Sequence, residues 1–475
     1  MADTSHAHAI VLGGSMAGML AAHVLARHVG TVTVVERDVL PDGPHQRRGL
    51  PQARHVHLLW SGGARIIEEL LPGTTDRLKA AGARLAGVHR DMLSLTSHGW
   101  QHRFDSPQFA VMCSRPLLDW VIRDRICTEG RVRVRRGEAA ELAGDAHRVT
   151  GVRVRDVTDG STAELDADLV VDATGRGSRL GQWLSALGAP PLDKDVVDSG
   201  MGYSTRVFKA PPGATAGFPV VNVLSDHRVD PPSCNGTVYP IEGDRWMVTL
   251  SGTRGTELPS REEEFVEYAY RLRHPIIGDL IRDAEPLTTV FRSYSGINRR
   301  LYPERLDRWP DGLVVLGDSL AAFNPLYGHG MSAAARAARA LDGWLAGPWT
   351  EPGAALAAQH AIGEVVDDPW IMATSRDICY AGCRNHSTDH RLTEGADALR
   401  SFTEIVATKT IRAPAVSAVV TDVTSLSAPQ SELGTSRFVS LMQRDALMPE
   451  LTEPPLHPDE LALVALDPAR KADLG

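Results

Sequence analysis

The first forty residues carry two apolar runs on either side of a helical pattern. Residues 8–14, HAIVLGG, and residues 31–38, TVTVVERD, each predict a buried strand. Residues 15–30 are rich in Ala, Leu and Met and end at Gly30, which predicts a helix with a glycine C-cap. Strand, glycine turn, helix and strand in this order indicate a parallel βαβ unit.

The rest of the chain changes its pattern three times. Apolar periodicity predicts helices at 55–73 and 114–126, and alternation predicts strands at 131–142, 148–157 and 162–175. Successive antiparallel strands are predicted at 199–210, 218–226, 235–242 and 245–255, followed by a helix at 261–273 and a strand at 287–300. A buried strand returns at 312–318, with an alanine-rich helix at 329–347, and the chain is helical after about residue 350.

These segments predict an α/β fold with an inserted α+β domain. A Rossmann-like nucleotide-binding domain is predicted to take residues 1–190 and 301–345, interrupted by an antiparallel-sheet domain at 191–300. Residues 346–448 form a helical region, and the proline-rich residues 449–475 are expected to form an extended tail.

Composition excludes several classes of protein. A formal net charge of -9 does not favour nucleic acid as a partner, and 43% hydrophobic residues are typical of a globular protein. The five scattered cysteines do not suggest a disulfide framework, and Cys379, Cys383 and His386 lack a fourth ligand at a suitable spacing, so no metal site is expected. The uncharged residues 7–26 contain the glycine turn, which argues against a membrane span, and the N-terminus lacks a basic signal-peptide start. We therefore expect a cytoplasmic protein.

The glycine turn VLGGSMAGML, residues 11–20, is an imperfect dinucleotide fingerprint. Gly13 and Gly18 have the spacing of its first and third glycines, whereas Ser15 occupies the middle position. The second strand ends near Glu36, where an acid accepts hydrogen bonds from ribose hydroxyls. The pattern predicts nucleotide binding at the helix N-terminus, and the alternative is a βαβ turn without a ligand.

A second motif, LVVLGDSLAAFNPLYGHGMSAAARAA, spans residues 313–338. Asp318 follows a buried strand and is placed to bond a ribityl chain. Gly328 and Gly330 precede a helix, whose N-terminus favours a ligand that develops negative charge, such as a reduced flavin. The alternative is a glycine-rich loop before a packing helix.

A third motif, DLVVDATGRGSRL at 168–180, leads a buried strand into a turn around Gly175 that can close over a cofactor. Arg115, at the start of the helix predicted at 114–126, supplies a cation for a phosphate or a flavin edge. A surface ion pair is the alternative for Arg115.

In this order and spacing, the three motifs resemble those of FAD-dependent monooxygenases of the p-hydroxybenzoate-hydroxylase-like fold, over most of residues 8–345. The sequence is more similar still to the flavin epoxidases of polyether-ionophore biosynthesis, of the lasalocid and monensin epoxidase type. That likeness is carried by RRGLPQARHVHLLWSGGARIIEELLPGTTDRL, HGWQHRF, DSGMGYSTRVF, RWMVTLSGTRG, VVLGDSLAAFNPLYGHGMSAAA and DDPWIMATSRDICYAGCR.

The resemblance implies FAD as cofactor and assigns residues to its parts. The adenosine diphosphate half would be held by Gly13, Ser15, Met16, Ala17, Gly18, Glu36 and Arg37. The rest of the cofactor would be approached by Arg47, Arg48, Gln52, Arg115, Gly175 and Asp318, and the isoalloxazine by Pro325, Gly328, Gly330 and Met331.

The resemblance also implies the chemistry. Reduced flavin forms a C4a-hydroperoxide with dioxygen, and its distal oxygen epoxidises alkenes of a long apolar polyene of polyketide type. Candidate walls of the substrate cavity are Tyr203, Phe208, Val221, Tyr239 and Trp246, with plain core packing as the alternative for each. An epoxidase avoids a strong acid beside its product, so His55, His57 and His329 are interpreted as hydrogen-bonding or structural residues.

One departure concerns the source of electrons. Aromatic hydroxylases of this fold carry an Asp-Gly pair in the third motif, where this chain has Thr174-Gly175. Electrons from NAD(P)H are therefore expected either directly or through a separate flavin reductase. Three alternatives stay open: an aromatic-ring hydroxylase, a flavin reductase that saturates prenyl chains, and a flavin-binding protein without turnover. A halogenase is disfavoured because no G-W-x-W-x-I-P stretch occurs.

Overall fold

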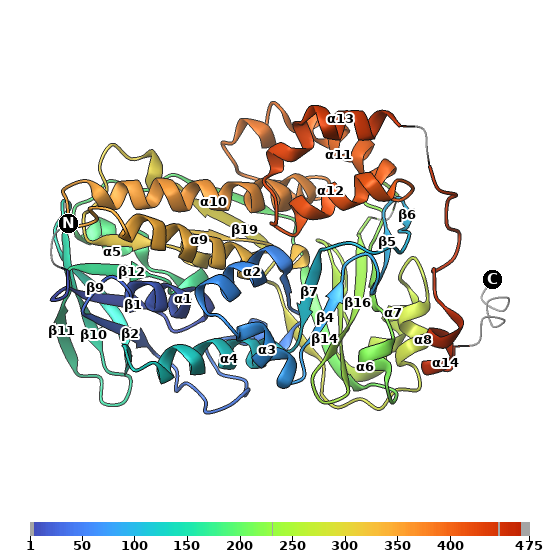
Figure 1. The fold of residues 1–475 in the computed structure, drawn as a ribbon, viewed down its shortest axis with the longest axis horizontal. Coiled ribbons are helices and arrows are strands. Elements are labelled where there is room, and N and C mark those ends of the chain that lie inside the picture. The colour runs from blue at the N-terminus through green and yellow to red at the C-terminus, as the bar shows by residue number, and fades with distance from the viewer. Residues whose placement is uncertain (1–3, 230, 445–446, 467–475) are drawn as a thin grey trace.

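A computed structural model describes residues 4–229, 231–444 and 447–466. The half of the molecule that contains the N-terminus is built on one parallel five-stranded sheet with the N-terminal strand in the centre (Figure 1). Across the sheet the strands are β20 (Leu313–Val315), β12 (Leu169–Asp172), β1 (His8–Leu12), β2 (Thr31–Glu36) and β8 (Val132–Arg136). The predicted βαβ unit is confirmed, because α1 (Met16–Leu25) connects β1 to β2, which pair in parallel.

Helices cover the middle of this sheet because β1, β12 and β20 are apolar and buried along almost their whole length. The main helices of this half are α2 (Ser61–Leu70), α4 (Arg115–Thr128), α9 (His329–Leu345) and α10 (Ala354–Asp377). Smaller elements are α3 (Thr74–Ala80), α5 (Leu180–Ala186) and an antiparallel meander of β9 (Glu138–Gly144), β10 (Val149–Arg155) and β11 (Thr162–Asp166). The strands and α1, α4, α9 and α10 share one hydrophobic core.

A seven-stranded sheet forms the second half. Its order is β18 (Phe291–Ser293), β14 (Gly202–Lys209), β17 (Arg245–Gly252), β16 (Cys234–Ile241), β15 (Val220–Val223), β5 (Met92–Thr96) and β6 (Gly99–Trp100). One face packs on α6 (Ala214–Gly217), α7 (Glu262–Tyr270) and α8 (Ile276–Ile281). The sheet therefore draws two strands from residues 92–100, outside the segment 191–300 predicted for it, and β15 pairs with β5 in parallel.

Two small sheets join the halves. One contains β3 (Leu58–Trp60), β7 (Phe109–Met112) and β4 (Arg84–Gly87). The other contains β21 (Ala321–Ala322), β19 (Ile297–Leu301), β13 (Lys194–Asp198) and β22 (Arg384–Asn385). The helix predicted over 55–73 is only partly correct, because Leu58–Trp60 pair with β7 and the helix begins at Ser61.

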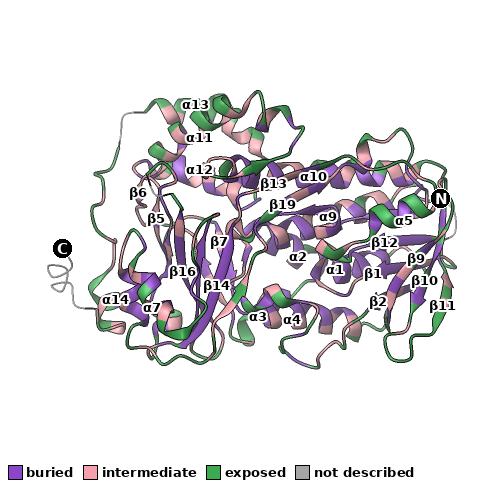
Figure 2. Ribbon diagram, turned by 180° about the vertical axis from the view of Figure 1, so that it is seen from behind, coloured by how far each residue is buried: buried purple, intermediate pink, exposed green. Residues whose placement is uncertain are grey.

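The C-terminal helices α11 (Ala396–Thr410), α12 (Pro414–Thr424) and α13 (Ser436–Gln443) lie together beside α10 and carry much exposed surface (Figures 1 and 2). The predicted extended tail contains a short helix, α14 (Pro458–Leu463), because Glu460 accepts from the backbone N–H of His457 and pairs with Arg103 at 2.7 Å. No described helix is long and apolar enough to cross a membrane. The uncharged residues 7–26 divide into β1, the turn and α1. The α/β fold is confirmed, whereas the exact domain limits stay a prediction.

Candidate active site

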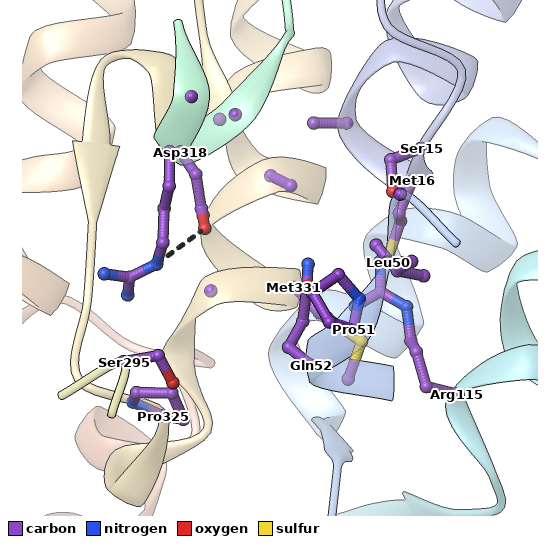
Figure 3. Close-up of a pocket in the computed structure, with 18 of the residues that line it drawn as sticks. Ser15, Met16, Leu50, Pro51, Gln52, Arg115, Ser295, Asp318, Pro325 and Met331 are labelled. Carbon is purple, nitrogen blue, oxygen red and sulfur yellow. Dashed lines mark ion pairs between the residues drawn. The ribbon is translucent and has the colours of Figure 1, made fainter. Parts of the chain in front are cut away.

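A cavity of about 540 Å³ extends from the carboxyl ends of β1, β2 and β12 to the seven-stranded sheet. Ligands of open parallel sheets bind at this edge, and the volume is that of a small-molecule site. Figure 3 shows residues from distant segments around it, with Asp318 and Pro325 on one side and Ser15, Met16 and Arg115 on the other.

The glycine turn forms one end of the cavity. Gly13 has φ +101°, and a Cβ there would lie 2.5 Å from the carbonyl oxygen of Ala173. Ser15 is the extended N-cap of α1 and makes no side-chain capping bond, which leaves N–H groups of the first helical turn for a ligand. Ser15, Met16 and Ala17 line the cavity with Gly13. Gly18 does not line it, because its role is packing: a Cβ there would overlap the carbonyl oxygen of Gly13.

Glu36 organises the end of β2. Its buried carboxylate accepts from the backbone N–H groups of Gly14 at 2.7 Å and Asp38 at 2.9 Å. It also lies 3.1 Å from Nη1 of Arg47. Glu36 and Arg37 both line the cavity, and the contact of Glu36 with a ribose stays a prediction.

Two arginines add positive charge next to the turn. Arg115 donates from Nε to Asp119 at 3.0 Å and lines the cavity together with Leu50 and Gln52 (Figure 3). Arg47 is buried and lines the cavity, whereas the neighbouring Arg48 is exposed and does not. Of these two neighbouring arginines, both predicted to approach the cofactor, the structure therefore brings only Arg47 to the cavity, where Glu36, Asp38 and Asp119 balance its charge.

The turn after β12 is tied to the turn after β20 through one buried carboxylate. Asp172 accepts from the hydroxyl groups of Thr174 at 2.6 Å, Ser178 at 2.5 Å and Ser319 at 3.1 Å. Ser319 in turn accepts from the N–H of Gly175 at 2.8 Å. Asp172 thereby holds together the turns that carry Gly175 and Asp318, and both of these residues line the cavity.

The loop of residues 324–328 forms the opposite wall. Pro325, Gly328, Gly330 and Met331 all line the cavity, and Gly328 has φ +66° at the N-cap of α9. Asn324 supports this loop from below, since its side chain accepts from the N–H of Leu326 at 3.2 Å and from the Tyr203 hydroxyl.

Asp377, at the end of α10, is a residue that sequence reasoning missed. Its buried carboxylate accepts from Nδ2 of Asn324 at 2.9 Å, Nδ2 of Asn298 at 2.7 Å and the Tyr327 hydroxyl at 2.6 Å. Burial raises the pKa of Asp377 to about 6, although these donors favour its ionised form. The available signal was an acid inside the apolar segment PWIMATSRDICY, which predicts a buried and therefore bonded carboxylate.

The seven-stranded sheet forms one wall of the cavity, and only the side chains on one face of its strands line that wall. Tyr203 and Tyr239 line the cavity as predicted. Phe208, Val221 and Trp246 do not: they are buried in the cluster between the sheet and α7 and α8. The prediction for these three residues is corrected, because side chains of opposite parity point to opposite faces of a strand.

The two histidines of the loop before β3 face the cavity. Nδ1 of His55 lies 2.8 Å from the Thr205 hydroxyl, and Nδ1 of His57 lies 2.8 Å from the carbonyl oxygen of His55. Burial lowers the pKa of His55 to about 4 and that of His57 to about 3, so both are neutral at pH 7. His329 is also buried with a pKa lowered to about 3, and it does not line the cavity.

The chain matches the FAD binding domain family, FAD_binding_3, over residues 6–356. It is 33% identical over 336 residues to protein Rv3254 of Mycobacterium tuberculosis, in an alignment covering 68% of this chain and 70% of that protein. The chain belongs to the FAD-binding monooxygenase family. Squalene monooxygenase of Rattus norvegicus is 24% identical over 346 residues, which cover 68% of this chain and 52% of that enzyme.

Solved structures support the fold of this FAD-dependent monooxygenase. PqsL of Pseudomonas aeruginosa, a probable FAD-dependent monooxygenase, superposes with a TM-score of 0.57 at 18% identity, over 90% of this chain and 100% of PqsL. The site fits FAD, because the helix N-termini at Ser15 and Gly328 both open onto the cavity without a side-chain cap. NAD(P)H is the electron donor typical of the family.

Proposed function

We propose that this FAD-dependent monooxygenase epoxidises alkenes of a long polyene of polyketide type in polyether-type secondary metabolism. The adenosine diphosphate half of FAD is held at the Gly13–Ala17 turn and Glu36, with Arg37, Arg47 and Arg115 supplying positive charge. Asp318, Gly175 and Gln52 contact the middle of the cofactor, and residues 325–331 contact its ring system. Bound FAD, once reduced, supplies the activation of dioxygen.

The distribution of charge in the cavity is the observation that carries the proposal. The charged lining residues are Glu36, Arg37, Arg47, Arg115, Glu138, Arg176, Arg179 and Asp318, all outside the seven-stranded sheet. In the described part of the chain, the sheet contributes only uncharged side chains to the lining. A phenolate or carboxylate substrate would find no counter-charge on this wall, which favours a neutral alkene over the substrate of an aromatic-ring hydroxylase.

The histidines support the same reaction. An epoxide opens readily in acid, and His55 and His57, the imidazoles nearest to the wall, have pKa values of about 4 and about 3. They can accept or donate hydrogen bonds without supplying a proton at pH 7. The buried bond between Tyr203 and Asn324 holds the loop in place beside the cavity.

The electron donor is a separate part of the proposal. Thr174, which lines the cavity, stands where the aromatic hydroxylases of the fold carry an acid, and its hydroxyl donates to Asp172 at 2.6 Å. We propose that NAD(P)H reduces the flavin either directly or through a separate flavin reductase. The five cysteines are free thiols, consistent with the reducing cytoplasm, where NAD(P)H is available.

The test incubates the purified, FAD-loaded protein with NADPH, ¹⁸O₂ and a polyene, with and without an added flavin reductase. We expect a product that carries one ¹⁸O atom at an alkene, detected by mass spectrometry. Formation of hydrogen peroxide alone would refute the proposal. Hydroxylation of a phenol panel would assign an aromatic hydroxylase, and saturation of the polyene without oxygen would assign a prenyl-chain reductase.

A further inference from the structure

The face of the seven-stranded sheet that meets the cavity is organised in rows across the strands. Register places residues of four strands opposite one another in the row Ser293, Tyr203, Ser251 and Asn235. Two residues further along, the next row on the same face is Phe291, Thr205, Thr249, Thr237 and Asn222. Apart from Phe291, which does not line the cavity, both rows consist of hydroxyl and amide side chains.

The third row on this face is mainly apolar, and its apolar members are covered by other parts of the protein. It contains Val207, Met247, Tyr239, Val220 and Met92. Its apolar members pack against Val56, Leu58 and the strand β7, where they form two buried clusters. The apolar part of this face is therefore already covered by protein, and the part left on the cavity is mainly polar.

Six hydroxyl groups of this wall line the cavity. They belong to Tyr203, Thr237, Tyr239, Thr249, Ser251 and Ser293. Four of them have protein partners: Thr249 bonds to Thr205 at 2.6 Å, Tyr203 donates to Asn324, Ser251 accepts from Asn235 at 3.4 Å, and Ser293 donates to Ser295 at 3.1 Å. Among the described residues, no protein group bonds the hydroxyl of Tyr239, and the buried Oγ1 of Thr237 has no partner.

The hydroxyls of Tyr239 and Thr237 need hydrogen-bond partners, which a hydrocarbon substrate cannot supply. Each hydroxyl offers one donor and two acceptor positions, and leaving them unpaired against a buried apolar chain is unfavourable. A neutral oxygen substituent satisfies them, whereas a carboxylate would be buried without a cation on the same wall.

We infer that the sheet wall recognises neutral oxygen substituents, hydroxyl or carbonyl groups, carried by the polyene near its reacting alkene. Tyr239 and Thr237 are then specificity-determining residues. This inference deepens the proposed function and rests on it: it replaces a purely apolar substrate by an oxygenated one. It also explains why the two free hydroxyls are retained in a wall where apolar side chains would fill the same space.

The experiment compares three matched probes: farnesol, its parent triene hydrocarbon and farnesoic acid. Binding to the FAD-loaded enzyme is measured from the change in the visible absorption of the flavin. We expect the alcohol to bind about tenfold more tightly than either of the other two. Tyr239→Phe and Thr237→Val should each reduce that preference about threefold to tenfold, without loss of stability, since neither hydroxyl has a protein partner.

Two variants serve as matched controls. Thr256→Val removes another buried hydroxyl without a partner, and Tyr270→Phe removes a hydroxyl bonded to Asp279, both outside the cavity lining. Both should keep the full preference. Equal binding of the hydrocarbon, tightest binding of the acid, no binding of any probe, or an unchanged preference in both Tyr239→Phe and Thr237→Val would overturn the inference.

The same mixtures, supplied with NADPH and dioxygen, judge the proposed function separately. Oxygenated products without a preference for the alcohol would leave the epoxidase proposal standing and overturn the inference. A clear preference for the alcohol without any oxygenated product would support the inference and overturn the epoxidase proposal.

Discussion

The two ends of the cavity are built in different ways. The turn end, residues 13–18 with Glu36, is shaped mainly by backbone conformation within a short segment. The loop end, residues 324–331, is held by side chains from three distant segments: Tyr203, Asn298 and Asp377. A single glycine decides the geometry of the first, whereas a buried hydrogen-bond network decides that of the second.

This difference predicts different responses to mutation. A change at the turn end acts on the backbone itself and should strongly weaken cofactor binding. At the loop end, a change should leave the cofactor bound through its other half but misplace the groups around its ring system. Binding and turnover can therefore be separated by choosing which end to alter.

Gly13→Ala should produce the largest effect. The φ of +101° is strained for alanine by about 1–3 kcal/mol, and the new Cβ would lie 2.5 Å from the carbonyl oxygen of Ala173. We expect FAD affinity to fall by about a hundredfold, measured by fluorescence titration of the apoprotein. Gly181→Ala in α5, where a Cβ meets nothing within 4 Å, is the control and should bind FAD normally. Normal FAD binding by Gly13→Ala would show that the backbone conformation at Gly13 does not determine cofactor binding at the turn end.

Asp377→Asn should separate binding from turnover. The new side-chain amide carries an NH₂ group where Asp377 has an acceptor oxygen. Its hydrogens would face Asn324 and Tyr327, which already donate to this position, so these contacts are disturbed. We expect about one FAD per chain but turnover lower by about tenfold to a hundredfold, from small displacements of the loop. Asp397→Asn, at an exposed carboxylate, should match the unaltered enzyme in both measurements. Loss of FAD from Asp377→Asn would mean that the two ends are not independent.

The same variant should change the pH dependence of stability. The folded-state pKa of Asp377, about 6, lies above its unfolded value of 3.8, so protonation favours the folded state. This contribution is fully present below pH 3.8 and is lost as the pH rises through about 6. It amounts to about 3 kcal/mol. The free energy of unfolding of the unaltered protein, relative to that of Asp377→Asn, should fall by this amount across that interval in urea titrations. A constant difference would contradict the assignment.

Thr174→Val should have the smallest effect. It removes one of several bonds to Asp172, and Ser178 and Ser319 remain. We expect about 1 kcal/mol less stability in urea unfolding and FAD affinity within about threefold of normal. Thr162→Val, on the exposed strand β11, should change stability by less than about 0.5 kcal/mol. If Thr174→Val instead stopped reduction by NADPH while FAD stayed bound, Thr174 would have a role in electron transfer.

The turn end was predictable from sequence because its requirements are local. Gly13, Ser15 and Glu36 are read from spacing within one βαβ unit, and the structure brings them to one cavity. The loop motif was also visible, since Pro325, Gly328 and Gly330 follow a buried strand.

The supports of the loop end were not predictable, because they depend on tertiary contacts. Asp377 lies 53 residues from Asn324 along the chain, and no local pattern connects them. The strand face of Phe208, Val221 and Trp246 was also undetermined. These strands are buried on both faces, so hydrophobicity does not indicate which side meets the cavity. The sequence also did not indicate which of Arg47 and Arg48 lines the cavity, because the direction of each side chain in a loop is set only by the folded structure.

The strand order β20-β12-β1-β2-β8 also affects how the protein is made. β12 has β20 as its outer neighbour, and β20 lies at residues 313–315. About 140 residues separate the end of β12 from β20, and at about 5–20 residues per second a ribosome needs roughly 7 to 28 seconds to add them. During that interval the buried strand β12 presents an unpaired edge, the kind of surface that other chains can join. Because Asp318 and residues 325–331 are synthesised later still, FAD cannot stabilise the unfinished sheet through them. Nascent chains halted before residue 312 should therefore be prone to aggregation even when FAD is abundant.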